Sequence, residues 1–98
     1  MSDKLTKDTA IAHRVLELKE NPSEKVDVFI GNPFQLGKDE WACPYRIVGG
    51  GIDLNLQIIG VDSVQALQLV FPIIDSAIIG TNVSLLWDGE EYLGFAPK

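Results

Sequence analysis

The sequence predicts an α+β fold: an antiparallel meander of about four strands, one amphipathic helix packed on one face, and a short C-terminal strand or hairpin. Two observations carry this prediction. Before position 60, apolar residues recur at every second position, which is the period of a half-buried strand. After position 60 they follow the 3.6-residue period of a helix.

The strand prediction rests on segments of alternating character separated by turn-forming residues. These segments are residues 11–19, 25–30, 41–48 and 52–58. Each places an apolar set on one face of the predicted sheet: Leu16 and Leu18; Val26, Val28 and Ile30; Trp41, Cys43, Tyr45 and Ile47; and Ile52, Leu54, Leu56 and Ile58. Short connections between such strands favour an antiparallel meander.

Two of the connections carry structural expectations of their own. Gly49-Gly50-Gly51 is predicted to form the turn before the last alternating segment. In the polar connection of residues 31–39, Phe34 and Leu36 are expected to fold back onto the domain. Pro44 has no N–H to donate, so its strand should lie at an edge there or contain a bulge.

The helix is predicted to begin at Asp62, a favourable N-cap, with Gln65 three residues later completing a variant capping box. Gly80 should end it as the first residue beyond the last turn. Pro72 lies inside and predicts a kink or a break. The stripe expected to face the sheet consists of Val64, Leu67, Phe71, Ile74 and Ile78, with Val70 and Ala77 beside it.

The C-terminal tail contains Asp88-Gly89 between apolar residues, which is a strong signal for a short hairpin. The pattern leaves two placements open. The tail could add a strand to an edge of the sheet, or it could cap the end of the helix.

Length and composition indicate one domain over residues 1–98, because a second core could not be built from 98 residues. The polar residues 1–9 are predicted to be disordered. They lack the apolar stretch of a secretory signal. The apolar region Val64–Ile79 is interrupted by polar residues and is shorter than the roughly 20 residues that span a bilayer. We therefore expect a cytoplasmic protein without a membrane partner.

The formal net charge is −6, and residues 1–25 contribute nothing to it because five basic and five acidic side chains cancel there. Nucleic-acid binding requires clustered Lys and Arg to replace counterions on phosphates, and the later part of the chain lacks such a cluster. An anionic membrane surface is disfavoured for the same reason. The charge instead favours a basic protein partner, although acidity also serves solubility alone.

Catalytic signals are weak, so we expect no cofactor and lean against an enzyme. His13 is the single histidine and Cys43 the single cysteine. A catalytic pair of the two would need a lowered thiol pKa, for which the sequence shows no cause. One Cys and one His cannot build a structural zinc site, so no metal site is predicted.

The chain also resembles a family of small bacterial proteins known only as a domain of unknown function. The resemblance is carried by Trp41-Ala-Cys-Pro-Tyr-Arg-Ile47, by Gly60-Val-Asp-Ser-Val-Gln-Ala-Leu67 and by a tail containing Leu86-Trp87. It covers most of residues 11–95 and implies a bacterial source and a strand-rich domain that ends in a helix and a tail. It implies no activity.

We expect a non-enzymatic, small acidic domain that binds a protein partner, such as an immunity or antitoxin-like protein. Phe29 is the odd apolar residue on the outer face of its strand and could contact a partner. The expected partner-binding residues are Asp27, Phe29, Asp53, Glu90 and Glu91. A homodimer, through a strand edge or the Leu69–Ile79 side, is also open.

The alternative is a small-ligand binder or a minor enzyme with a pocket between the helix and the sheet. That pocket would be lined by Trp41, Cys43 and Tyr45. Core packing is the competing interpretation for these residues, because aromatic rings and a mid-strand Cys are commonly buried.

Overall fold

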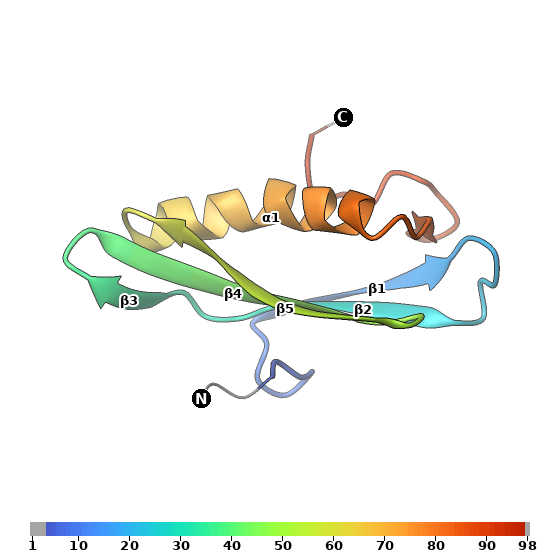
Figure 1. Ribbon diagram of the computed structural model, residues 1–98, viewed down its shortest axis with the longest axis horizontal. Helices are drawn as coiled ribbons and strands as arrows, with labels where there is room; N and C mark the ends of the chain where they lie inside the picture. The colour runs from blue at the N-terminus through green and yellow to red at the C-terminus, as the bar shows by residue number, and fades with distance from the viewer. Residues whose placement is uncertain (1–3, 98) are drawn as a thin grey trace.

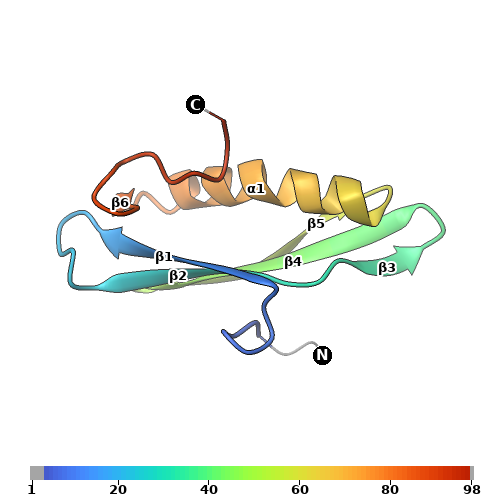
Figure 2. The ribbon, with the colours of Figure 1, turned by 180° about the vertical axis from the view of Figure 1, so that it is seen from behind.

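The computed structural model describes residues 4–97 and has two layers, a twisted antiparallel sheet and one helix lying across it (Figure 1). The N-terminal segment lies on the opposite face of the sheet from the helix (Figure 2). In chain order the elements are β1 (Ala12–Leu18), β2 (Lys25–Ile30), β3 (Phe34–Gly37), β4 (Glu40–Gly49), β5 (Ile52–Gly60), α1 (Ser63–Gly80) and β6 (Leu85–Leu86).

The four predicted strands are present as β1, β2, β4 and β5, and they form the expected antiparallel meander. The sheet nevertheless has six strands, more than the four predicted. β3 and β2 both pair with one side of β4, while β5 pairs with its other side. The short strand β6 pairs with β1 at the far edge.

Pro44 explains why β2 and β3 are separate strands. The N–H of Gly31 donates to the carbonyl of Pro44 (N···O 2.9 Å), but Pro44 has no N–H with which to return the bond. The ladder stops at this point and resumes in β3 with the pair Phe34–Ala42. Pro44 therefore lies in a central strand and not at an edge. The expected irregularity occurs on the other side of the ladder, where β2 ends and β3 begins.

The prediction that Phe34 and Leu36 fold back onto the domain was wrong. Both lie in β3 and are exposed, and the register between β3 and β4 shifts at Leu36, between Gln35 and Gly37. The connection that follows β2 pairs with β4 again, as β3, because β4 extends beyond the end of β2 and offers free backbone N–H and C=O groups.

Helix α1 begins as predicted. Asp62 is the N-cap, and its carboxylate accepts a hydrogen bond from the N–H of Gln65 at 2.8 Å. The side-chain oxygen of Gln65 accepts from the N–H of Val61, also at 2.8 Å. One free N–H of the first helical turn and the N–H of the residue before the N-cap are thereby satisfied, which is a variant of the capping box.

The face of α1 that meets the sheet is rotated from the predicted stripe. The fully buried residues are Ala66, Val70, Ile74 and Ile78. Of the predicted stripe, Ile74 and Ile78 are buried and Leu67 is half-buried, whereas Val64 and Phe71 are exposed. Small residues permit the close contact: a Cβ on Gly60 would lie 2.5 Å from the N atom of Ala66.

The helix also runs further than predicted. It continues without a break through Pro72, and Gly80 is its last helical residue, not the residue beyond it. Thr81 is the C-cap, and the left-handed conformation falls on Asn82 (φ 61°). In length and mean hydropathy (1.5), α1 could cross a membrane, but a core helix meets the same criterion, so this is weak evidence.

The core fills the space between α1 and the sheet, as the two periodicities predicted. The faces named for β1, β2 and β4 supply the largest fully buried side chains, including Leu16, Val26 and Ile47. On β5 the corresponding residues Ile52, Leu54 and Ile58 are half-buried because this strand lies at the edge of the sheet. Leu56 is an exception and is treated below.

The tail places β6 beside β1, with Leu85 opposite Leu18 and Leu86 opposite Glu17. The tail therefore extends the sheet, which settles one of the two placements left open. Asp88 and Gly89 both have positive φ (51° and 81°), as a two-residue hairpin turn of type I′ requires. The flanking residues Trp87 and Glu90 exchange backbone hydrogen bonds of 2.8 and 3.0 Å.

Residues 1–9 were predicted to be disordered. Residues 1–3 lie outside the described part of the chain, but Thr6–Thr9 form a hydrogen-bonded turn. The carbonyl of Leu5 accepts from Arg46 Nη1 at 2.8 Å, which fixes this segment to the outer face of the sheet. The N-terminal segment thus covers part of the face of the sheet opposite α1.

Candidate functional site

Six of the chain's fourteen acidic residues lie at one end of the molecule. The connection between β1 and β2 and the turn after β6 lie side by side there, at the right of Figure 1 and the left of Figure 2. We call this region the acidic end, and it comprises Glu17, Lys19, Glu20, Glu24, Lys25, Asp88, Glu90 and Glu91. The six carboxylates of this region are opposed by its two lysines and by Arg14, whose guanidinium contacts the Trp87 ring, which leaves a formal charge of 3 − 6 = −3.

Backbone and side-chain bonds hold the two segments of the acidic end together. Glu17 accepts from the backbone N–H of Gly89 at 2.9 Å and pairs with Lys25 Nζ at 3.3 Å. Both contacts lower the pKa of Glu17, the Gly89 N–H most strongly. Lys19 Nζ lies 2.6 Å from Glu91 Oε1, and this bond lowers the pKa of Glu91 and raises that of Lys19. The turn after β6 is thus fixed against β1.

An open hollow of about 220 Å³ lies in this turn, lined by Trp87, Asp88, Glu90 and Tyr92. Asp88 and Glu90 are exposed and have no basic side chain within ion-pair distance in the described part of the chain. The Tyr92 hydroxyl donates to the carbonyl of Ala96 at 2.6 Å, so the ring is fixed by the tail itself.

Trp87 is anchored by Arg14. The Arg14 guanidinium carbon lies 3.7 Å from the centroid of the Trp87 ring and 5.1 Å from that of Phe95. Its Nη1 donates to the carbonyl of Leu93 at 2.9 Å. Contact with a ring face and a hydrogen bond to the tail position the indole before any partner arrives.

The hollow combines two carboxylates with two aromatic rings, which suits a Lys or Arg side chain. A guanidinium or ammonium group is attracted by carboxylate oxygens and by the negative face of an aromatic ring.

The predicted partner-binding residues fall into two groups. Glu90 and Glu91 lie at the acidic end. Asp27 lies on the outer face of the sheet, where its Oδ1 is 2.7 Å from His13 Nε2. Phe29 is only 6% exposed and stacks on the His13 ring (centroids 4.6 Å apart), so it presents little surface to a partner.

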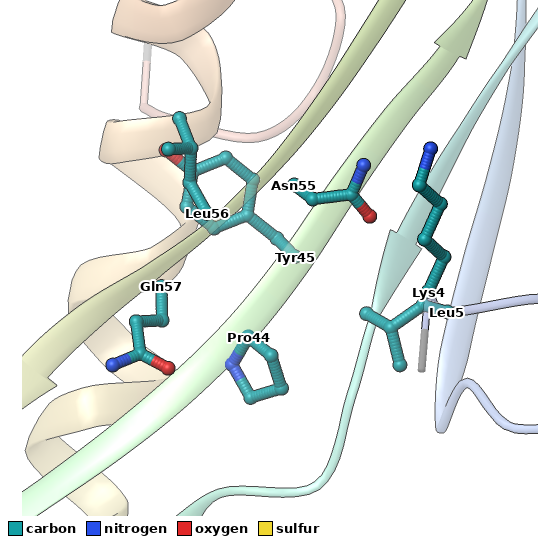
Figure 3. A pocket seen from close by; sticks show the side chains of 7 residues that line it. All are labelled: Lys4, Leu5, Pro44, Tyr45, Asn55, Leu56 and Gln57. Atoms are coloured by element: carbon teal, nitrogen blue, oxygen red, sulfur yellow. The ribbon is translucent and has the colours of Figure 1, made fainter. Parts of the chain in front are cut away.

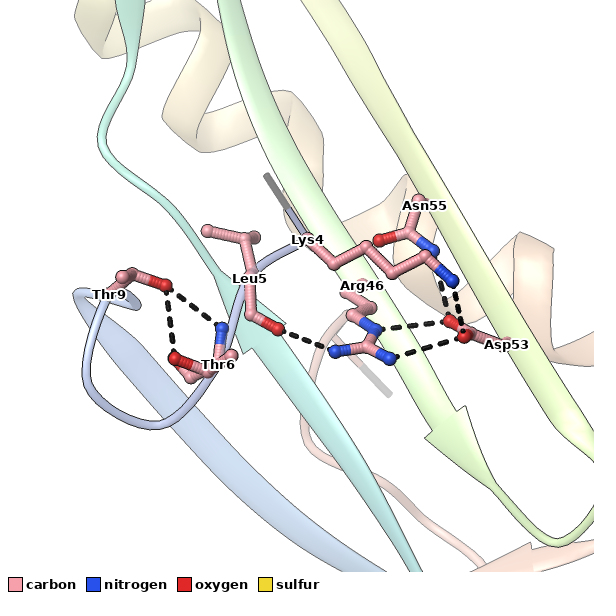
Figure 4. A network of polar contacts seen from close by, with 7 residues as sticks. All are labelled: Lys4, Leu5, Thr6, Thr9, Arg46, Asp53 and Asn55. Atoms are coloured by element: carbon pink, nitrogen blue, oxygen red, sulfur yellow. Dashed lines mark hydrogen bonds and ion pairs between the residues drawn. The ribbon is translucent and has the colours of Figure 1, made fainter. Parts of the chain in front are cut away.

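Asp53 belongs to a separate network on the outer face (Figure 4). Arg46 makes a two-pronged ion pair with it, with N···O distances of 3.0 and 3.1 Å. Lys4 Nζ lies 3.1 Å from the same carboxylate, and Asn55 donates to it at 2.9 Å. Arg46 first, and then Lys4, hold the pKa of Asp53 well below its usual range. Asp53 is therefore already neutralised inside the chain.

The three residues of the alternative ligand pocket all face α1. Cys43 is fully buried, Tyr45 is buried and Trp41 is half-buried, and all three pack in the core. Burial raises the pKa of the Cys43 thiol to about 11 and raises that of Tyr45. A thiol with such a pKa is protonated at neutral pH and is a poor nucleophile.

A larger hollow, of about 470 Å³, lies instead along β4 and β5 and the N-terminal segment (Figure 3). Its lining residues are Lys4, Leu5, Pro44, Tyr45, Asn55, Leu56 and Gln57. Its one cation, Lys4, is held by Asp53. Within residues 4–97, no group of three His, Cys, Asp or Glu side chains is arranged to hold a metal ion.

The family described as "Domain of unknown function (DUF6968)" matches residues 12–97. The chain belongs to this family. No curated protein and no solved structure matches it. Membership in the DUF6968 family confirms the resemblance to an uncharacterised domain family and carries no activity with it.

Sequence reasoning missed much of the acidic end, namely Glu20, Glu24, Trp87, Asp88 and Tyr92. The available signal was the segment Trp87-Asp-Gly-Glu-Glu-Tyr92, in which an Asp-Gly turn and two further acids lie between two aromatic residues. The sequence could not show that this hairpin lies beside the end of β1. The two residues of the Lys19–Glu91 pair, which joins them, are 72 residues apart along the chain.

Proposed function

We propose that this DUF6968 domain is a non-enzymatic protein-interaction domain that binds a basic segment of a partner at its acidic end. A Lys or Arg side chain of the partner occupies the hollow between Trp87, Asp88, Glu90 and Tyr92. The observation that supports this is the combination of two uncompensated carboxylates with two fixed aromatic rings in one opening.

The expected energetics are those of an exposed, charged contact. A cation over an aromatic ring contributes about 0.5–1 kcal/mol at exposed sites. The surrounding formal charge of −3 accelerates the encounter with a basic partner more than it strengthens the final complex. Binding should therefore be fast and should weaken as salt screens the field, whose range is about 8 Å at physiological ionic strength.

An immunity or antitoxin-like role is a narrower form of the same proposal. A protein that neutralises a basic toxin would present its carboxylates in the arrangement found here. The search for the partner therefore begins with basic proteins encoded beside the gene.

The test is a titration of ¹⁵N-labelled protein with a short peptide containing two Arg residues. The control peptide carries citrulline, which keeps the shape of Arg and removes its charge. We expect the indole signal of Trp87 and the backbone signals of residues 88–92 to shift with the Arg peptide and not with the citrulline peptide. The indole of Trp41, half-buried at the core, serves as the internal reference.

Matched variants locate the effect. Asp88→Asn with Glu90→Gln removes two charges from the hollow, and Asp39→Asn with Glu40→Gln removes two from the turn between β3 and β4 at the other end. The first pair should weaken peptide binding about tenfold, which corresponds to about 1.4 kcal/mol. Equal weakening by both pairs would mean that net charge alone attracts the peptide, and the proposal would be abandoned.

A further inference from the structure

The outer edge of β5 is the longest unpaired edge of the sheet among the described residues. β5 pairs with β4 over nine consecutive residue pairs in unbroken register, and residues 4–97 place no strand on its other side. The other edges are shorter: β3 is four residues long with a shifted register, and β6 covers one end of the seven-residue strand β1. Natural proteins rarely leave a long regular edge without a Pro, a Lys or a bulge unless another chain pairs with it.

The hydrogen bond at Pro44 shows which backbone groups of β5 face outward. The Pro44 carbonyl accepts from Gly31, so residue 44 directs its backbone groups toward β2, and residues 43, 45 and 47 direct theirs toward β5. The β5 partners of those three residues are Ile58, Leu56 and Leu54. The free N–H and C=O groups therefore belong to the alternate residues Asp53, Asn55, Gln57 and Ile59.

Leu56 lies at the centre of this edge and is unusual. It belongs to the face of β5 that meets α1, yet its side chain is 50% exposed, whereas its neighbours Leu54 and Ile58 are half-buried. In Figure 3 it lies beside Tyr45, at the border of the large hollow. A strand paired with this edge would cover the Leu56 side chain by placing a cross-strand neighbour opposite it.

Charge selects the partner. Over most of its surface a chain of charge −6 repels a second copy. The β5 edge is different: Asn55, Gln57 and Ile59 are uncharged, and the carboxylate of Asp53 is neutralised by Arg46 and Lys4. At this edge two copies can therefore meet without repulsion between like charges.

We propose that two copies of the chain pair through β5 in antiparallel register about a two-fold axis at Leu56. This register places Asn55 opposite Gln57 of the second copy and Asp53 opposite Ile59, and it uses all four outward-facing residues of each strand. The two Leu56 side chains meet as a non-hydrogen-bonded pair, with Cα atoms about 4.5 Å apart. The pairing joins the two sheets into one.

Engineered disulfides test the register. Leu56→Cys should form a disulfide across the axis under mild oxidation, because about 4.5 Å lies within the Cα range of such bonds. Asn55→Cys and Gln57→Cys should not cross-link with themselves, since each is offset from its own copy by two residues, but a mixture of the two should cross-link. Cys43 is buried, so the wild-type protein is the control. Failure of Leu56→Cys to cross-link faster than the other single variants overturns the register.

Sedimentation tests the interface independently. The wild-type protein should show a monomer–dimer equilibrium, and Leu56→Lys should shift its dissociation constant upward by at least tenfold by placing two ammonium groups at the axis. Val64→Lys carries the same charge change on an exposed position of α1 and should leave the constant unchanged. Circular dichroism verifies that both variants fold. A monomeric wild-type protein at every concentration, or a dimer indifferent to Leu56→Lys, overturns the proposal.

Discussion

The Cys43 thiol donates a hydrogen bond to the carbonyl of Gly31 (S···O 3.7 Å). This carbonyl stands opposite Pro44, which has no N–H to offer it. The neighbouring thiol therefore satisfies a buried acceptor that the sheet ladder leaves unpaired. The single cysteine of the chain has a structural role next to the single proline of the central strand.

The first prediction follows from the replacement of the missing Pro44 N–H by the Cys43 thiol as the donor to Gly31. Cys43→Ala should lower the free energy of unfolding by about 1–3 kcal/mol, because a buried acceptor loses its partner. Pro44→Ala supplies the missing N–H, so Cys43→Ala should cost about 1 kcal/mol less in that background. Urea unfolding of the four proteins measures this coupling. Additive effects of the two substitutions would contradict the proposed role of the thiol.

The second prediction concerns the reactivity of Cys43. With a thiol pKa of about 11, about 0.1% of the group is thiolate at pH 8, and the side chain is fully buried. Labelling with iodoacetamide should therefore be negligible in the folded protein and rapid in urea, as followed by mass spectrometry. Rapid modification of the folded protein would revive a nucleophilic function for Cys43.

The third prediction compares two glycines. A Cβ at Gly60 would meet backbone atoms of Ala66 at 2.5 and 2.9 Å, so Gly60→Ala should destabilise the fold by about 1–3 kcal/mol. Gly80 lies in the last turn of α1 with free space around its Cα, so Gly80→Ala should stabilise by about 0.5–1 kcal/mol. Thermal unfolding of both variants measures the difference. Equal effects would mean that α1 does not pack against β5 as closely as described.

The fourth prediction concerns pH and the Asp53 network. The pKa of Asp53 is lowered in the folded protein, so its ion pairs stabilise the fold above its unfolded pKa, about 3.9, and that contribution declines as the pH falls below it. The urea midpoint of wild type should exceed that of Asp53→Asn at pH 6, and the difference should shrink steadily as the pH falls below about 3.9. Glu17 and Glu91 also have lowered pKa values, but they are present in both proteins and cancel in the comparison. A difference independent of pH would contradict the role of the carboxylate charge.

The fold was predictable from sequence wherever periodicity was unambiguous. The alternation in β1, β2, β4 and β5 identified the strands and the face of each that meets the helix. β3 escaped because its four residues include a glycine, and its pairing is available only through the extra length of β4. No local pattern carries that information.

The helix illustrates a different limit. α1 is apolar around much of its circumference, so several stripes fit a 3.6-residue period equally well. The stripe that is buried contains Ala66, whose backbone lies so close to Gly60 that a side chain on the glycine would collide with it. Hydrophobicity favoured Phe71 and Val64, whereas the space available at the contact favoured Ala66 and Val70. The close contact at Gly60 therefore determines which face of α1 meets the sheet, and the hydrophobic pattern alone could not identify that face.

The acidic end could be predicted only in part, because its charges come from opposite ends of the chain. Glu90 and Glu91 were identified from their position in an acidic tail. Glu20 and Glu24 were hidden in a segment whose net charge is zero, and they join the site only because β6 pairs with β1. Asp27 and Asp53 have partners of their own, His13 and Arg46, which strand pairing brings close and which no local sequence pattern indicates. Their role in partner binding stays a prediction.

The position of β6 at the opposite border of the sheet from β5 has a consequence for recognition. Two copies joined at β5 would carry their acidic ends at opposite extremities of one rigid platform. A partner with two basic segments at matching separation would then bind with avidity, because the second contact forms without a second encounter. A monomeric basic peptide would measure the strength of one end alone and would understate the affinity of a bivalent partner.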